Sequence, residues 1–214
     1  MTRTVIGLFP DSNEAQAALH SLENAGFTRD HLSLVAYDGS GEYSSAAKDE
    51  SELGSNTTKG AAAGGIAGLL LGLAAVAIPG IGPVIAAGPI AAALAGAGVG
   101  AASGGMLGAL ADMGVPGHEA KYYEEAIRRG GTLLIVRAED EMAEQAQSIL
   151  ERHGALDIED RAAGWRAEGW SPDDTHSDAS NYGDEGGSSQ WSHTALTASE
   201  ARRPVRAYPD NRKP

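Results

Sequence analysis

The sequence predicts an α+β domain that is interrupted by a Gly/Ala-rich helical hairpin and followed by a disordered tail. Residues 1–59 carry 9 acidic and 4 basic side chains and residues 113–161 carry 11 and 6, whereas the 52 residues between Lys59 and Asp112 carry none. Strand and helix patterns alternate in both charged parts. From Ala162 onward the chain is rich in Gly, Ser, Asp and Asn and shows neither period. The predicted regions are therefore 1–59, 60–112, 113–161 and 162–214.

The first part of the domain has the pattern of a strand, a helix and a second strand. Residues 4–9 are β-branched or apolar and end before a proline, which is typical of a strand. Asp11 stands three residues before a glutamate, the spacing of a capping box, so a helix is expected from here to Gly26. Residues 31–37 alternate between apolar and more polar side chains, which indicates a half-buried strand. A linker rich in Ser and Glu follows.

The second part of the domain repeats this order with one additional helix. Residues 119–129 form a short helix with glutamate–arginine pairs four residues apart. Residues 132–138 are strongly apolar and predict a buried strand. A further helix is expected from Asp140 to Gly154, and residues 156–158 then alternate like a short edge strand. Two such split βαβ units most often pair as a four-stranded antiparallel sheet with helices on one face, so we expect a ferredoxin-like arrangement.

The uncharged insert carries two runs of glycine with a strict four-residue spacing. Four residues advance about 400° around a helix, so each run lies along one helix face, where a second helix can approach closely. The sequence Pro-Gly-Ile-Gly-Pro at 79–83 cannot continue a helix and predicts a turn. We therefore expect a helical hairpin with arms at 60–78 and 90–111. The candidate helix-packing residues are Gly60, Gly64, Gly68, Gly72, Gly96, Gly100, Gly104 and Gly108.

Two interpretations of this hairpin remain open. Each arm is long enough to cross a bilayer core of about 30 Å at 1.5 Å per residue, so the insert could anchor the protein to a membrane. The second arm has few large apolar side chains, which favours a soluble hairpin that packs on its own domain or on copies of itself. Both interpretations predict association of helices through glycine.

The sequence shows no catalytic or metal-binding pattern, so we expect no enzyme activity, no cofactor and no metal. The chain has no cysteine, which excludes disulfides, thiolate ligands and a cysteine nucleophile. No two of the six histidines stand three or four residues apart. The glycines at 96–100 follow no predicted strand, so they do not indicate a dinucleotide-binding loop. The net charge of −13 disfavours nucleic acid as a partner.

The tail contains three tryptophans, Trp165, Trp170 and Trp191. Tryptophan is enriched at binding hot spots, so these side chains are candidates for docking an unknown partner. Alternatively, one or two of them fold back onto the domain.

Several segments resemble the bacterial family of heat-induced general stress protein 17M-like domains. The resemblance rests on the strand at 4–9, on Ala25-Gly26-Phe27, on the strand that begins at His31 and on residues 119–138. It covers about residues 3–161 and extends to the Gly/Ala-rich insert of longer members. The resemblance implies a stress-associated protein without an active site that can be carried over to this chain.

These observations predict a non-enzymatic general stress protein that uses its glycine-zipper hairpin to self-associate or to bind a membrane. The expected location is the cytoplasmic face of the cell membrane, or alternatively the cytoplasm. The alternative function is a soluble sensor domain that binds a small ligand.

Overall fold

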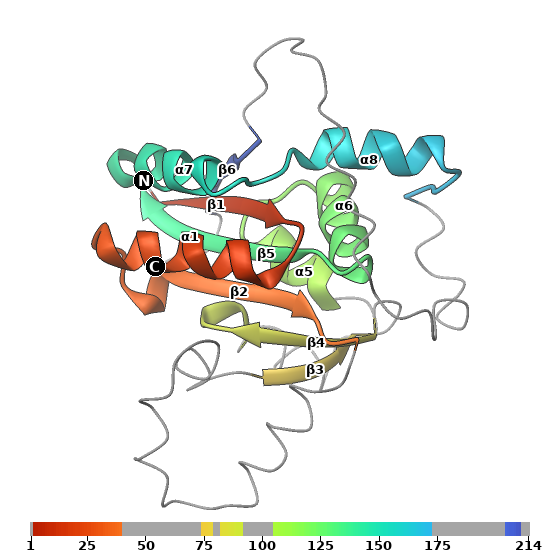
Figure 1. Ribbon diagram of the computed structural model, residues 1–214, viewed down its shortest axis with the longest axis horizontal. Helices are drawn as coiled ribbons and strands as arrows, with labels where there is room; N and C mark the ends of the chain where they lie inside the picture. Colours follow the sequence, from red (N-terminus) through yellow and green to blue (C-terminus); the bar gives the residue numbers. More distant parts are fainter. Residues whose placement is uncertain (1, 40–73, 79–81, 92–104, 173–203, 211–214) are drawn as a thin grey trace, which may run out of the picture.

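The computed structural model describes residues 2–39, 74–78, 82–91, 105–172 and 204–210 of the chain. They form a mixed α+β fold around one six-stranded sheet (Figure 1). The strands are β1 (Thr2–Phe9), β2 (Leu32–Tyr37), β3 (Ala74–Ile78), β4 (Gly82–Ala87), β5 (Thr132–Glu139) and β6 (Arg206–Pro209). The helices are α1 (Ser12–Asn24), α5 (Gly105–Asp112), α6 (Gly117–Arg128), α7 (Asp140–Arg152) and α8 (Ile158–Ala167), with a short 3-10 helix at Arg29–His31.

The strands are arranged in the order β3-β4-β2-β5-β1-β6, and each neighbouring pair is antiparallel. β5 and β1 lie in the middle and pair along their whole length, from Thr2 opposite Glu139 to Phe9 opposite Thr132. β6 adds to the free side of β1, although more than half of the chain separates the two strands in sequence.

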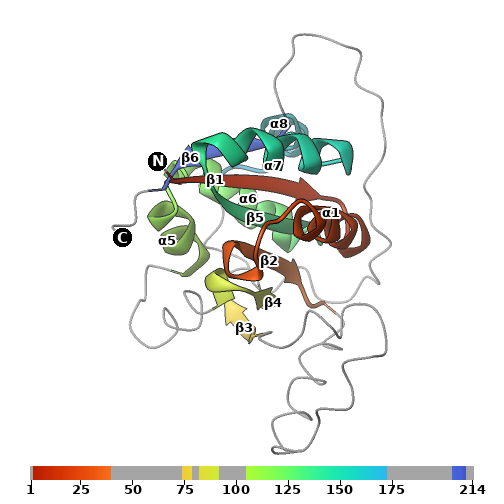
Figure 2. The ribbon, with the colours of Figure 1, turned by 90° about the vertical axis from the view of Figure 1, so that its left-hand side faces the viewer.

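Helices cover both faces of the sheet, which corrects the expectation that they lie on one face only. Leu134 and Val136 of β5 belong to the core that α1 and α7 cover. Leu133 and Ile135 belong to a second core, which α5, α6 and α8 complete. Figure 2 shows α1 and α5 on opposite sides of the strands. A strand that is apolar on both faces requires such double cover, because neither face can be left in water.

Several elements predicted from local signals are present. The helix expected after Asp11 is α1, and the Asp11 carboxylate accepts hydrogen bonds from the backbone N–H groups of Asn13 and Glu14. The helix ends before Gly26, whose φ of 96° lies in the left-handed region. The strands expected at 4–9, 31–37 and 132–138 are β1, β2 and β5, and the helices at 119–129 and 140–154 are α6 and α7.

The first arm of the predicted helical hairpin is wrong over its last residues. Ala74–Ile78 form β3, which pairs with β4 in the register Ile78 opposite Gly82, so the chain reverses as a β-hairpin. β4 closes the edge of β2, and β3 pairs in turn with the backbone N–H and C=O groups along the other edge of β4, which a helix could not satisfy. The second arm is helical at 89–91 and in α5, while residues 60–73 and 92–104 lie outside the described residues.

The predicted edge strand at 156–158 and the predicted disorder from 162 onward also need correction. Only Leu156 forms a β-bridge, with Leu8, and Ile158 already begins α8. The Asp157 carboxylate caps that helix by accepting hydrogen bonds from two backbone N–H groups of its first turn. Residues 162–172 and 204–210 therefore have defined structure, and residues 173–203 lie outside the described part.

None of the described helices combines the length and the apolar character that a membrane crossing requires.

The double cover of β5 predicts that truncation of its core side chains is strongly destabilising. Leu134 is fully buried, so Leu134→Ala should lower the free energy of unfolding by about 2–5 kcal/mol. The matched control is Gln145→Ala on the exposed side of α7, which should change that free energy by less than about 0.5 kcal/mol. Urea denaturation measures both. Equal midpoints for the two variants would contradict the assignment of β5 to the core.

Candidate functional site

The C-terminal strand β6 is held on β1 by two buried side chains that point to opposite faces of the sheet. Val205, just before the strand, is 1% exposed and belongs to the core beneath α7. Tyr208 is 7% exposed and belongs to the opposite core, beneath α6 and α8. The backbone N–H of Asp210 donates to the carbonyl oxygen of Thr2, 3.1 Å away, at the end of the ladder. This side of the sheet is therefore completed by a segment from the far end of the chain.

Close backbone contact adds to this docking at one glycine. Gly114 has a φ of 88°, and a Cβ built there would collide with the carbonyl oxygen of Pro209. Only glycine leaves room for the strand at this point.

Beneath β6 lies a buried cluster of two tyrosines and a glutamate. Glu119 and Tyr123 stand four residues apart on α6, so both side chains lie on the face that meets the sheet. The Tyr208 hydroxyl donates a short hydrogen bond to the Glu119 carboxylate and lies 3.1 Å from the Tyr123 hydroxyl. The three groups thereby satisfy one another where water is excluded.

Burial raises the pKa of both tyrosines above the ordinary value. The hydrogen bond between Tyr123 and Tyr208 lowers the pKa of Tyr123, whereas the nearby Glu119 charge raises it further. For Tyr208, the proximity of Tyr123 and the hydrogen bond to Glu119 add to the effect of burial. Both hydroxyls are therefore protonated at neutral pH, where they can donate hydrogen bonds within the cluster.

Charged side chains anchor the ends of β6. The Arg137 guanidinium lies 2.8 Å from the Asp210 carboxylate, whose side chain is 1% exposed. Arg206 lies 3.3 Å from Glu159 and 3.8 Å from Asp157, on the side of α8. These contacts fix the register of the strand on β1.

Three buried polar atoms around β6 have neither a hydrogen bond nor an ion pair among the described residues. They are Thr4 Oγ1, Asp157 Oδ2 and Arg206 Nε, whereas Arg206 Nη2 is held by its ion pair with Glu159. Thr4 is the residue opposite Tyr208 in the ladder. A buried polar atom without a hydrogen bond costs about 1–3 kcal/mol, so this docking is incompletely satisfied.

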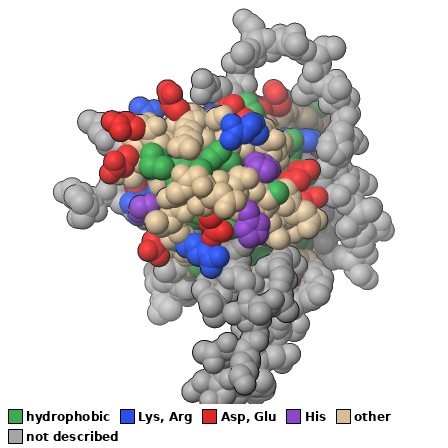
Figure 3. All heavy atoms as spheres, turned by 60° about the vertical axis from the view of Figure 1, so that its left-hand side comes forward, with side chains coloured by type: hydrophobic (Ala, Val, Ile, Leu, Met, Phe, Trp, Pro, Cys, Tyr) green, Lys and Arg blue, Asp and Glu red, His purple; other side chains and the backbone are tan. Residues whose placement is uncertain are grey.

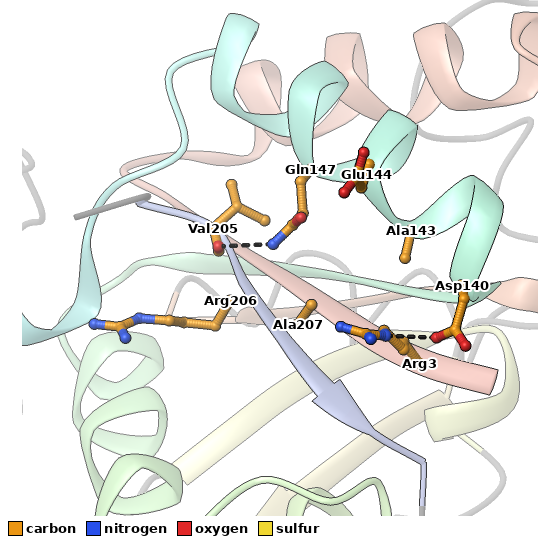
Figure 4. A pocket seen from close by; sticks show the side chains of 8 residues that line it. All are labelled: Arg3, Asp140, Ala143, Glu144, Gln147, Val205, Arg206 and Ala207. Atoms are coloured by element: carbon orange, nitrogen blue, oxygen red, sulfur yellow. Dashed lines mark hydrogen bonds and ion pairs between the residues drawn. The ribbon is translucent and has the colours of Figure 1, made fainter. Parts of the chain in front are cut away.

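A cleft of about 550 Å³ lies beside β6, between this strand and α7. Figure 4 shows Arg3 and Asp140 paired at one end of the cleft, 2.6 Å apart, while the Arg206 side chain extends away from them. Gln147 of α7 donates a hydrogen bond to the carbonyl oxygen of Val205, 3.3 Å away. The lining residues are Arg3, Asp140, Ala143, Glu144, Gln147, Val205, Arg206 and Ala207.

Two of the three tryptophans pack on the domain. Trp165 of α8 is 6% exposed, and its ring meets that of Trp170 edge to face with centroids 5.9 Å apart. The Arg129 guanidinium lies 5.2 Å from the centroid of the Trp165 ring, a cation–π contact. Trp170 also packs against Tyr122. Trp191 lies outside the described residues.

Of the eight glycines predicted to pack helices together, only Gly108 lies among the described residues. It belongs to α5, and no described atom lies within 4 Å of a Cβ built there. The described part of the chain thus does not bring a second helix against this glycine. The other seven, Gly60, Gly64, Gly68, Gly72, Gly96, Gly100 and Gly104, lie outside the described residues.

The described residues contain no group of three or more His, Asp or Glu side chains arranged to hold a metal ion. His153 caps the end of α7 and lies 2.8 Å from the Ser21 hydroxyl of α1, a contact that joins two helices. Comparison with family models, with curated proteins and with solved structures gave no match. The candidate site is therefore defined by geometry alone, as the groove along β1 that β6 occupies.

Sequence reasoning did not single out the residues of this groove. One signal was present, because residues 205–208 alternate between apolar side chains and larger side chains with polar ends, between two prolines. The pairing of Glu119 with Tyr208 joins residues that are 89 positions apart, which no local pattern reveals.

The tyrosine–glutamate cluster predicts opposite effects for two nearly isosteric substitutions. Tyr208→Phe removes the hydroxyl that Glu119 and Tyr123 contact, so it should lower the free energy of unfolding by about 1–3 kcal/mol. Thr4→Val removes a buried hydroxyl that has no hydrogen bond, so it should be neutral or stabilising. Urea denaturation of the two variants checks this. A larger loss for Thr4→Val than for Tyr208→Phe would contradict the network.

The raised pKa values predict that Tyr123 and Tyr208 ionise only when the protein unfolds. Since the folded pKa lies above the unfolded value of about 10, the stability that these groups contribute is present below pH 10 and is lost as the pH rises above it. Alkaline titration, followed by tyrosinate absorbance and circular dichroism, should show two tyrosines that ionise together with unfolding. The Tyr208→Phe variant should show one.

Proposed function

We propose that the protein is a non-enzymatic general stress protein that self-associates through its glycine-rich insert. The observation that carries this proposal is the composition of β3, the strand at one end of the six-stranded order. Its five residues, Ala-Ala-Val-Ala-Ile, contain no charge and no proline, and β4 is its one described neighbour. An apolar strand without charge or proline at a sheet edge is a template for pairing with another chain.

The two outermost strands of the sheet, β6 and β3, differ in how well their free edges are blocked against pairing with another chain. β6 contains Arg206 and Pro209 and is followed by Asp210, and charges and proline are the usual means of blocking an edge. β3 has none of these devices and lies between the two glycine runs of the insert. Edge pairing of β3 with β3 of a second copy would continue the sheet and bring the two glycine-rich inserts together.

We also assign strands β6, β1, β5 and β2 to a ferredoxin-like arrangement. The support is their order and their antiparallel pairing, with β6 as the outermost strand of the set. In this assignment β4 and β3 of the insert extend the arrangement beyond β2, and α5 and α6 cover its second face.

Self-association predicts that a charge in β3 lowers the oligomeric mass. Val76→Lys introduces a charge at the centre of the edge strand, and Gly68→Leu plus Gly104→Leu removes two small residues from the insert. Light scattering should show a lower mass for both variants than for the natural chain. The control is Gln145→Lys on the exposed side of α7, which should leave the mass unchanged.

A natural chain that is monomeric at all accessible concentrations, or variants with unchanged mass, would count against this proposal. Location at the cytoplasmic face of the membrane is a separate part of the proposal, which rests on the uncharged stretch from 60 to 111. Flotation with liposomes tests this part independently. Full recovery of the protein in the lipid-free fraction would reject location at the membrane and leave the proposal of self-association in the cytoplasm.

The second candidate function is that of a small-ligand sensor, and the cleft between α7 and β6 is the observation that favours it. Its lining combines two arginines, two carboxylates and an amide with small apolar residues, which suits a compact polar ligand (Figure 4). A thermal-shift screen with nucleotides and amino acids should then raise the melting temperature of the natural chain but not that of Gln147→Ala. A screen without any shift would reject this function.

A further inference from the structure

We propose that the free side of β1 is a binding site for extended peptides and that residues 204–210 are an exchangeable occupant of this site. The expected ligand carries an aliphatic residue, a tyrosine three positions later and an acidic residue two positions after that. This pattern is Val205, Tyr208 and Asp210 of the chain itself. Addition of such a strand to an exposed sheet edge is a general mode of peptide recognition.

The contacts of the occupant have the form of a ligand in a groove. The backbone ladder to β1 is short, with four residue pairs from Arg3–Pro209 to Ile6–Arg206. Specific contacts come from side chains on both faces of the strand, each with its own receptor. Val205 enters one core, and Tyr208 enters the other and reaches Glu119. These are the two elements, backbone pairing and side-chain pockets, that give a strand-addition site its affinity and its specificity.

The residues that contact β6 are held in place by other elements of the fold and do not depend on β6 for their position. β1 is already paired along its whole length with β5 on its other side. Glu119 and Tyr123 are held on α6, Arg137 on β5, and Asp157 at the start of α8. Each receptor side chain is thus positioned by an element that precedes the connecting residues 173–203.

The present occupant fills its site incompletely. The cleft of about 550 Å³ lies against Ala207, whose methyl group is too small to fill it (Figure 4). On the other side of the strand, Thr4 Oγ1, Asp157 Oδ2 and Arg206 Nε have no hydrogen bond. An occupant that is matched better at either position would bind more tightly, so the groove is able to exchange its own strand for another.

The covalent connection allows this exchange. Residues 173–203 link Pro172 to Pro204, and an extended chain of this length reaches as far as roughly 100 Å. Release of residues 204–210 therefore requires no break in the chain. Because the connection also keeps the native strand at high local concentration, a competing peptide in solution must bind well to displace it.

The test uses the full chain with a specific protease site inserted between residues 173 and 203. After cleavage, the C-terminal fragment should remain bound, and native mass spectrometry should detect the complex. A fluorescent peptide of residues 204–214 should then replace the fragment in a saturable manner, followed by fluorescence anisotropy. A fragment that cannot be exchanged without unfolding of the protein would overturn the proposal, because β6 would then be a permanent part of the fold.

Peptide variants test the specificity of the groove. Tyr208→Ala should weaken binding of the peptide at least tenfold, since it removes the aromatic anchor and leaves Glu119 without its donor. Ala207→Leu should strengthen binding about tenfold by filling the cleft beside α7. Asn211→Ala, beyond the last residue of the proposed pattern, is the matched control and should change binding less than about twofold.

Equal affinity of the Tyr208→Ala peptide and the native peptide would show that the groove binds any extended chain and would overturn the proposed specificity. Weaker binding of the Ala207→Leu peptide would show that the cleft is not part of the peptide site. Neither result depends on the mass of the protein, so this test is independent of self-association through β3.

Discussion

The fold depends on the burial of β5 on both of its faces and along both of its edges. Leu133, Leu134, Ile135 and Val136 are four consecutive apolar residues, so each face of the strand needs a layer of helices. Its backbone groups need a strand on each side, and β1 and β2 provide them. Helix α5 follows from the same need, because it covers the face that α1 and α7 leave open. Other acidic, basic and histidine side chains lie at the surface, and Figure 3 shows them mixed over one face of the molecule around a short band of hydrophobic side chains.

Part of the insert therefore has a different role from the one that its composition indicates. The lack of charge in the insert predicts a separate helical hairpin, but residues 74–78 and 82–87 of the insert are strands that extend the sheet of the domain. The prolines and glycines at 79–83 predict a reversal of the chain, and the chain does reverse between Ile78 and Gly82, but the segments on either side are strands. Ala, Val and Ile without a period fit a helix and a strand equally well, so the strand conformation follows from the backbone edges of β2 and β4, with which β4 and β3 pair. A tertiary constraint thus overrode a local pattern that was ambiguous.

Local signals predicted the elements whose ends are set by neighbouring residues. Asp11 and Gly26 delimit α1, and the apolar run of β5 identifies a buried strand. The helix α8 also had such signals, in the cap at Asp157 and in the stripe formed by Ile158 and Trp165, but alternation across 156–158 indicated a strand instead. The groove could not be predicted, because β6 is defined by contacts with β1 and α6 rather than by its own four residues. The order of the strands was likewise beyond a single sequence.

The position of β1 has a consequence for synthesis of the protein. β1 ends at Phe9, and it is made before its two partners, which begin at Thr132 and Arg206. At a synthesis rate of about 5–20 residues per second, both edges of this strand lie open for several seconds before β5 is made. Its second edge stays open until Arg206–Pro209 have also left the exit tunnel. Completion of the sheet thus waits for β6, and a nascent chain that stalls before Arg206 would expose a strand edge that chaperones and other chains can bind.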